Sequence, residues 1–251
     1  MPDALIHTTA MAGRAIRLSS RAVDALVVAL ALPLMLLLVF VYLLGGAIDT
    51  GTRYITYVVP GILVLCAAFG AANTAVAVSE DMKGGVVDRF RALDVSGTAM
   101  LAGHVIASTL RNLVSTALVL GAGLLMGFRP DASAAGWLAA GALLVAFLVA
   151  ISWLAAAVGL LARTPEAAGG FTFFMTFLPY PSSAFVPVES MPGWLRAFAD
   201  HQPATPVIES LRGLLLGQPV GSTPYAALLW CAGIAAVAVA LSERLFRLRT
   251  G

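Results

Sequence analysis

The segment VSEDMKGGVVDRFRALDVS occupies residues 78–96 and determines how the rest of the chain is interpreted. It contains seven charged residues, whereas the runs that flank it at residues 58–78 and 101–128 are almost free of charge. Each flanking run is long enough to cross a lipid bilayer as a helix. The segment is therefore predicted to be a polar connection between two membrane-spanning helices.

This connection is predicted to contain a helix of its own. Two consecutive glycines interrupt the helix that continues out of the preceding run, because glycine costs about 1 kcal/mol relative to alanine inside a helix. After them, Val86, Phe90 and Leu93 recur at spacings of four and three, which predicts a short amphipathic helix over residues 86–93. So short a helix is marginal on its own, and a groove on a partner protein would stabilise it. The alternative is a charged loop that only fixes the orientation of its neighbours.

The composition of the whole chain agrees with a membrane protein. Of its 251 residues, 60% are hydrophobic and 11% are charged, whereas a soluble domain has about half apolar and about a quarter charged residues. The net charge of +2 gives no electrostatic basis for binding nucleic acid. The two cysteines, Cys66 and Cys231, fall within apolar runs, so each is expected to pack as a small hydrophobic residue.

Apolar runs of about 20 residues predict an all-α protein with six spans. The predicted spans are residues 25–46, 58–78, 101–128, 137–161, 167–186 and 225–246. The fifth is interrupted near its end by Pro179 and Pro181. No internal repeat is visible, so a single transmembrane domain over residues 1–251 is predicted.

Basic residues predict the orientation, because they are enriched in cytoplasmic connections. Ten lie on one side: Arg14, Arg17, Arg21, Lys83, Arg89, Arg91, Arg163, Arg244, Arg247 and Arg249. Four lie on the other: Arg53, Arg129, Arg196 and Arg212. Both termini and the charged segment are therefore predicted to be cytoplasmic, with the chain in the cell membrane.

Two further segments are predicted to lie at the membrane surface. Residues 10–24 carry Arg14, Arg17 and Arg21 at spacings of three and four among apolar residues, which predicts an interfacial helix; a solvated basic segment is the alternative. Residues 192–217 predict two short helices that begin at prolines and form an external re-entrant element. Their aromatic residues Trp194 and Phe198 would lie at the outer interface.

Polar residues within the predicted spans are few. Asn73, Arg111, Asn112 and Ser152 are the notable ones, so an ion-coupled carrier lacks obvious coupling groups. Arg111 and Asn112 could line a substrate path together with Asn73. The alternative, which we favour, is that the Arg111 side chain extends toward the cytoplasmic interface.

No constellation in the sequence predicts chemistry in this chain. A phosphate-binding loop needs a lysine before serine or threonine, but Lys83, the only lysine, precedes Gly84. A G-x-S-x-G motif is absent, and the histidines His7, His104 and His201 are too scattered to predict a metal site. The chain is thus expected to hold no cofactor, and any ATP would be bound by another polypeptide.

Two segments resemble a known family, the permease subunits of type-2 ABC exporters, and in particular the daunorubicin/doxorubicin-resistance branch. The family pattern E-x-x-x-G-T-x-x-R-x-R-x-x-P-V-S corresponds to Glu80, Gly84, Arg89, Arg91, Val95 and Ser96, with one additional residue between Gly85 and Arg89. Gly85 stands where threonine is usual and Asp94 where proline is usual. Residues 182–195 and 201–207 are similar to the external segment that precedes the family's last span.

The resemblance implies a half-transporter that pairs with a second permease chain, identical or paralogous, and with two ATPase subunits that bind ATP and Mg²⁺. Residues 86–93 would be the coupling helix, with ATPase contacts at Glu80, Gly84, Gly85, Val86, Arg89, Phe90, Arg91 and Leu93. The external gate would include Pro192, Trp194, Phe198, Glu209 and Arg212. Amphipathic drugs, antibiotics or lipids would be the substrates.

Two other functions remain as alternatives. A non-transporting scaffold could recruit cytoplasmic partners through the same charged segment. An ion-coupled carrier would keep transporting after ATP depletion and stop when the proton gradient collapses.

Overall fold

The computed structural model describes residues 23–83 and 97–250, and every regular element in these two ranges is helical. The elements are α2 (Val23–Leu38), a π-helical turn η1 (Val39–Leu44), α3 (Tyr54–Lys83), α5 (Gly97–Leu125), α6 (Ala134–Leu161), α7 (Pro165–Phe177), a 3-10 turn η2 (Val188–Ser190), α8 (Gly193–His201), α9 (Ala204–Leu215) and α10 (Thr223–Thr250). The prediction of an all-α protein is confirmed.

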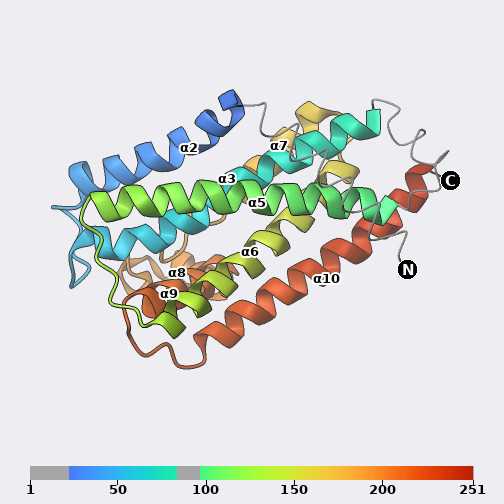
Figure 1. Cartoon of the computed structure of the whole chain (residues 1–251). Helices are drawn as coiled ribbons and strands as arrows, with labels where there is room; N and C mark the ends of the chain where they lie inside the picture. The colour runs from blue at the N-terminus through green and yellow to red at the C-terminus, as the bar shows by residue number, and fades with distance from the viewer. Residues whose placement is uncertain (1–22, 84–96, 251) are drawn as a thin grey trace.

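The four longest helices, α3, α5, α6 and α10, run lengthwise through one bundle (Figure 1). The short helices α8 and α9 lie at the end where α6 and α10 begin (Figure 1). At the opposite end α3 finishes and α5 starts, on either side of the charged segment, and α10 ends there too (Figure 1). One end of the bundle therefore carries the charged connection between α3 and α5, and the other carries α8 and α9.

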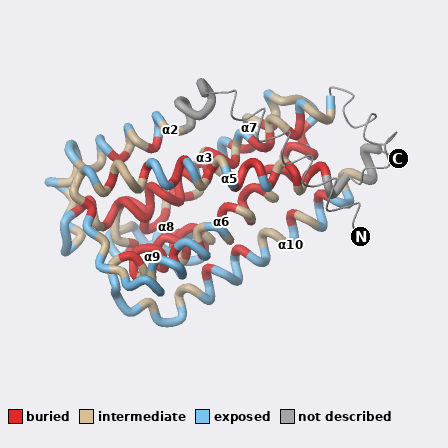
Figure 2. The backbone as a smooth tube through the Cα atoms, in the orientation of Figure 1, coloured by how far each residue is buried: buried red, intermediate tan, exposed pale blue. Residues whose placement is uncertain are grey.

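Helix α3 is the centre of this bundle. It contacts α2, α5, α6, α7 and α9, and buried residues cover all of its faces (Figure 2). Helix α10 packs mainly on α6 and α9 and leaves much of its surface exposed (Figure 2). A helix that is apolar all round belongs in the interior of a bundle, which explains why α3 takes this position.

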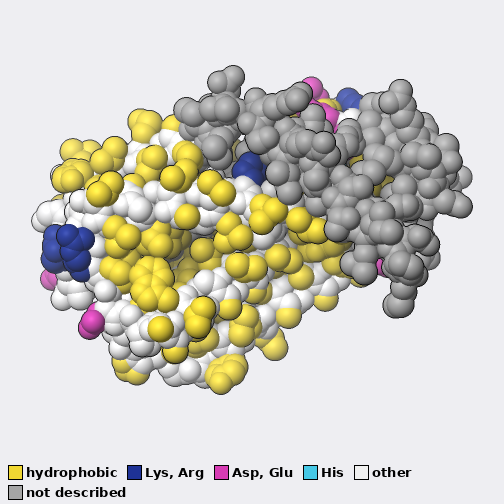
Figure 3. Space-filling model, in the orientation of Figure 1, with side chains coloured by type: hydrophobic (Ala, Val, Ile, Leu, Met, Phe, Trp, Pro, Cys, Tyr) yellow, Lys and Arg dark blue, Asp and Glu magenta, His cyan; other side chains and the backbone are white. Residues whose placement is uncertain are grey.

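Four helices of the described chain are long and apolar enough to cross a membrane: Tyr54–Lys83, Met100–Leu125, Ala134–Leu161 and Thr223–Phe246. Hydrophobic side chains cover the face of the bundle in Figure 3, with few charges among them, as expected for a surface in contact with lipid. The chain is a multi-pass membrane protein.

The first and fifth predicted spans are less regular. The first combines α2 and η1 and carries Pro33 within the helix. The fifth is helical only over Pro165–Phe177, which at 1.5 Å per residue extends about 20 Å and falls short of the roughly 30 Å of hydrocarbon. The chain leaves the helix just before Pro179, because proline cannot continue it. A count of six spans rests on these two segments and stays a prediction.

Other local predictions are confirmed. Two short helices, α8 and α9, follow prolines at their N-caps, Pro192 and Pro203, although their re-entrant position remains a prediction. Cys66 and Cys231 are buried free thiols.

Glycines let backbones approach closely inside the bundle. A Cβ atom built on Gly61 would lie 2.6 Å from the Cα of Ala184, and one on Gly159 would overlap the carbonyl oxygen of Ala75. Because small residues allow close helix contacts in membranes, these two positions fix how tightly α3 packs on its neighbours.

Candidate functional site

The charged connection between α3 and α5 lies largely outside the described residues. Its predicted ATPase contacts Gly84, Gly85, Val86, Arg89, Phe90, Arg91 and Leu93 belong to that part, as do the interfacial residues Arg14, Arg17 and Arg21. Glu80 is described: it is exposed, near the end of α3.

The two helices that flank this connection are joined by a polar contact. His104 Nε2 on α5 lies 3.0 Å from Asp81 Oδ2 on α3, and both side chains are largely buried. In the sequence, His104 is one of three scattered histidines. No spacing signal could have linked it to Asp81, because the two residues are separated by the whole connection.

A second polar region is found where α7 ends. We call residues 178–187 the proline turn, since Pro179, Pro181 and Pro187 prevent a regular helix there. Its backbone carbonyls are paired with side chains from other elements. Tyr54 Oη donates to the Phe185 carbonyl at 2.9 Å, and Gln202 Nε2 donates to the Pro181 carbonyl at 2.8 Å.

Arg212 of α9 makes the strongest of these connections. Its Nη2 donates to the Ser183 carbonyl at 2.6 Å, and its Nε donates to the Tyr57 carbonyl at 3.2 Å. Its Nη1 lies 2.6 Å from Glu209 Oε1, and the guanidinium carbon sits 3.7 Å from the centre of the Tyr57 ring. Only 7% of Arg212 is exposed. One cation therefore joins α3, α9 and the proline turn.

This burial divides the predicted external gate into two groups. Arg212 is buried, whereas the Glu209 side chain that pairs with it is 41% exposed. Trp194 and Phe198 on α8 are exposed instead, and their spacing of four places them on one face. Pro192 is the N-cap of that helix. The sequence counted Arg212 as an external loop charge, whereas the structure gives it a buried anchoring position.

A third polar region lies in the interior, where α3, α5 and α6 meet. We call Thr74, Ser108, Asn112 and Ser152 the hydroxyl cluster. Thr74 Oγ1 donates to Ser108 Oγ at 2.7 Å, and Ser108 Oγ lies 3.0 Å from Ser152 Oγ. Asn112 Nδ2 donates to Ser108 Oγ at 3.4 Å. Ser108 thus links three helices, and the cluster contains no charged residue.

The predicted substrate-path residues differ in how far they are buried. Asn112 is 1% exposed and belongs to the hydroxyl cluster, with its side chain packed so closely on α3 that a Cβ atom at Gly70 would overlap it. Arg111, its neighbour in sequence, is partly buried, and Asn73 is exposed. Their role in a substrate path stays a prediction.

Sequence reasoning missed several members of these regions. Ser108, Asn112 and Thr116 recur every four residues along one face, a signal that could have identified a buried polar stripe. Tyr54, Tyr57 and Gln202 carried no comparable signal, because their partners are carbonyls of distant backbone.

The polar side chains of these regions are suited to binding and to positioning helices, rather than to catalysis. Within residues 23–83 and 97–250 no three His, Cys, Asp or Glu residues are grouped so as to hold a metal ion. The buried groups donate and accept hydrogen bonds between helices. Fold and polar regions together define a helical membrane protein whose buried polar groups hold helices to one another.

Comparison with known proteins identifies the family. The chain belongs to the ABC-2 type transporter family, whose model matches residues 7–216. It is 35% identical over 218 residues to the daunorubicin resistance ABC transporter permease protein DrrB1 of Streptomyces coeruleorubidus. This match covers 86% of this chain and 77% of that protein. It is 28% identical over 211 residues to the probable doxorubicin resistance permease DrrC of Mycobacterium tuberculosis, covering 83% and 76%. The expected membership of this branch is confirmed.

Proposed function

We propose that the chain is the permease subunit of an ATP-driven exporter that moves amphipathic, drug-like molecules out of the cell. The observation that carries this proposal is the similarity to a drug-resistance permease over 86% of the chain. The absence of a phosphate-binding loop from the sequence agrees with a separate ATPase subunit that holds ATP and Mg²⁺.

The two ends of the bundle suit two different tasks. The charged segment of residues 84–96 connects α3 to α5 at one end, and we propose that the ATPase binds it there on the cytoplasmic side. At the other end, the α8–α9 pair and the proline turn form a cross-linked unit. A second permease chain, identical or paralogous, would complete the translocation path.

Movement would reach the bundle through α3 and α5. Closure of the ATPase dimer would push the segment between them, which is attached directly to both helices. The neutral hydroxyl cluster lets these helices exchange hydrogen bonds as they shift, whereas the end held by Arg212 stays fixed. ATP binding would in this way bias an equilibrium between two arrangements of the bundle.

The proposal is tested by expressing the chain with its ATPase subunit in drug-sensitive bacteria and measuring efflux of doxorubicin. We expect the double variant Arg89→Glu, Arg91→Glu and the variant Phe90→Asp to lose efflux and co-purification of the ATPase, while still inserting into the membrane. Arg163→Glu, an exposed charge reversal in the α6–α7 connection, is the matched control and should retain both.

Efflux at the wild-type rate by the double variant would contradict the proposal. Co-purification of a partner that does not hydrolyse nucleotide would favour the scaffold instead. Efflux that survives ATP depletion and stops when the proton gradient collapses would favour the ion-coupled carrier.

A further inference from the structure

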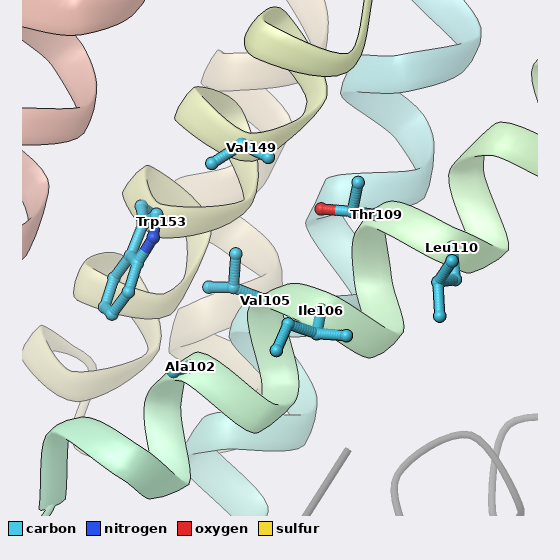
Figure 4. A pocket seen from close by; sticks show the side chains of 7 residues that line it. All are labelled: Ala102, Val105, Ile106, Thr109, Leu110, Val149 and Trp153. Carbon is cyan, nitrogen blue, oxygen red and sulfur yellow. The ribbon is translucent and has the colours of Figure 1, made fainter. Parts of the chain in front are cut away.

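An open pocket lies between α5 and α6, away from the polar contacts described above. Its volume is about 260 Å³. The lining residues are Ala102, Val105, Ile106, Thr109, Leu110, Val149 and Trp153 (Figure 4). Thr109 lies about 14 Å along the helix from Met100, where the apolar span of α5 begins, so the pocket opens at the depth of the hydrocarbon. A molecule would therefore enter it from the lipid.

Thr109 is the lining residue that carries a hydroxyl group. Thr109 is 8% exposed, and its hydroxyl oxygen has no hydrogen-bond partner. In Figure 4 the oxygen points from α5 toward α6, on the side where Val149 and Trp153 lie. A buried hydroxyl without a partner is unfavourable, because it has lost its hydrogen bonds to water.

Three other threonines of the bundle satisfy their hydroxyls within their own helices. The hydroxyls of Thr116, Thr172 and Thr176 each donate to a backbone carbonyl four residues earlier, at 2.8 to 3.0 Å. This is the ordinary way for a threonine to satisfy its hydroxyl inside a helix. The Thr109 hydroxyl makes no such bond, and its oxygen points toward α6 (Figure 4).

We propose that this pocket binds the ring system of the transported molecule, a flat aromatic amphiphile that carries a hydrogen-bonding group at the edge of the ring. The proposal rests on the exporter function proposed above. Trp153 offers an aromatic surface for the ring, and the Thr109 hydroxyl can donate to, or accept from, a carbonyl or hydroxyl group of the ligand. An acyl chain would fill the same space but leave the hydroxyl unpaired.

The size of the pocket limits what it holds. Enclosed sites for drug-sized molecules have volumes of about 300–1,000 Å³, so this one takes the ring portion and leaves the rest of the ligand at the mouth. The exposed residues Ile106 and Leu110 form part of the lining. The pocket is thus suited to the capture of a molecule from the membrane.

A ligand in the pocket would affect the charged connection through packed side chains. Val105 belongs to a buried cluster with Val78 of α3, and Trp153 and Met82 pack against that cluster. Met82 lies one residue before the end of α3. A ligand that fixes the separation of α5 and α6 at the pocket therefore contacts the side chains that support this end of α3.

The binding site can be tested in the complete permease–ATPase complex in lipid nanodiscs. Phenylalanine replaces Trp137, Trp194 and Trp230, which leaves Trp153 as the only tryptophan of this chain, and an ATPase subunit without tryptophan is used. Doxorubicin is the probe, and its quenching of Trp153 fluorescence gives an affinity. In this background we expect Thr109→Val to weaken binding about five- to tenfold, the loss of one hydrogen bond. Ala102→Phe, which fills the pocket, should abolish quenching.

Matched controls test whether the loss of affinity is specific to the pocket. Thr116→Val removes a hydroxyl that is already bonded to its own helix, and Ala117→Phe adds a ring to an exposed position on α5 outside the pocket. Both should retain the affinity of the background protein. Equal affinities for Thr109→Val and Thr116→Val would overturn the proposal.

The same protein separates the remaining outcomes. If brominated phospholipid quenches Trp153 and doxorubicin does not relieve that quenching, the pocket holds an acyl chain and the proposal is overturned. If the complex exports doxorubicin but the probe does not quench Trp153, the pocket proposal fails and the exporter function stands. If the wild-type complex does not export doxorubicin and the probe does not quench Trp153, both fail.

Discussion

The proline turn and the hydroxyl cluster are both buried polar regions in an apolar bundle, but they are held together differently. At the proline turn, a cation and two neutral side chains donate to fixed backbone carbonyls. In the hydroxyl cluster, small neutral groups bond to one another. A backbone carbonyl that loses its donor in a membrane has no water to replace it, whereas a hydroxyl can rotate to another partner. The comparison suggests one rigid end and one adaptable interior.

The largest effect is expected at Arg212. Arg212→Met leaves the Ser183 and Tyr57 carbonyls and the Glu209 carboxylate without their shared donor. Hydrogen bonds to charged groups contribute about 1.5–3 kcal/mol each, so the free energy of unfolding should fall by about 3 kcal/mol or more. The measurement is the loss of folded protein on denaturation in detergent.

Arg196→Met is the control for this change, because Arg196 forms an exposed pair with Asp200 at 3.8 Å. Such surface pairs contribute about 0.5 kcal/mol or less. If the two arginine variants were equally stable, the proline turn would not be the rigid region.

A change of size at Gly61 tests the same turn without altering any polar group. Gly61→Ala places a methyl group 2.6 Å from the Cα of Ala184, so α3 and the turn must move apart. Overpacking of this kind costs about 1–3 kcal/mol. Gly121→Ala on α5 meets no atom within 4 Å and should be neutral or stabilising. A stabilising effect of Gly61→Ala in thermal unfolding would show that the contact is loose.

Removal of one neutral donor at the turn should have a smaller effect. Tyr54→Phe deletes the hydroxyl that donates to Phe185, and the free energy of unfolding should fall by about 1 kcal/mol. Tyr225, which is 76% exposed, supplies the control Tyr225→Phe. Equal unfolding midpoints for the two variants would mean that the Phe185 carbonyl finds another donor.

The smallest change in stability is expected in the hydroxyl cluster, even at its central residue. Ser108→Ala should cost about 0.6 kcal/mol, the average for hydrogen bonds between membrane helices. Ser242→Ala is the control, because the Ser242 hydroxyl is buried without a hydrogen-bond partner. We expect Ser108→Ala to alter the efflux rate more than the stability. A loss of stability equal to that of Arg212→Met would remove the distinction between the two regions.

Much of the fold could be predicted from the sequence, because it follows from local composition. Runs such as residues 137–161 are long, apolar and free of charge, and they appear as helices within a few residues of the predicted bounds. The prolines that begin α8 and α9, and those that end α7, act within their own turn of the chain. Only the irregular segments, α2 with η1 and the short α7, departed from a simple count of spans.

The candidate sites were predicted less completely. Glu209 and Arg212 were named as external gate residues, which stays a prediction, but the buried partners of Arg212, Tyr57 and Ser183, were not named. Asn112 was named with Arg111, although its partner is Ser108. Each residue type was noticed because it is polar in an apolar chain. Its partners were not, because polarity does not identify what a side chain bonds to.

Composition and spacing settle that this protein lies in the membrane as a set of helices, and the motif around residues 80–96 indicates its family, since these properties depend on neighbouring residues. The assembly of helices settles which polar groups meet. Arg212 and the Tyr57 carbonyl are 155 residues apart, and Thr74 and Ser108 belong to different helices. Such pairs exist only once α3, α5, α6 and α9 have packed, because hydrogen bonds act over about 3 Å in space whatever the separation along the chain.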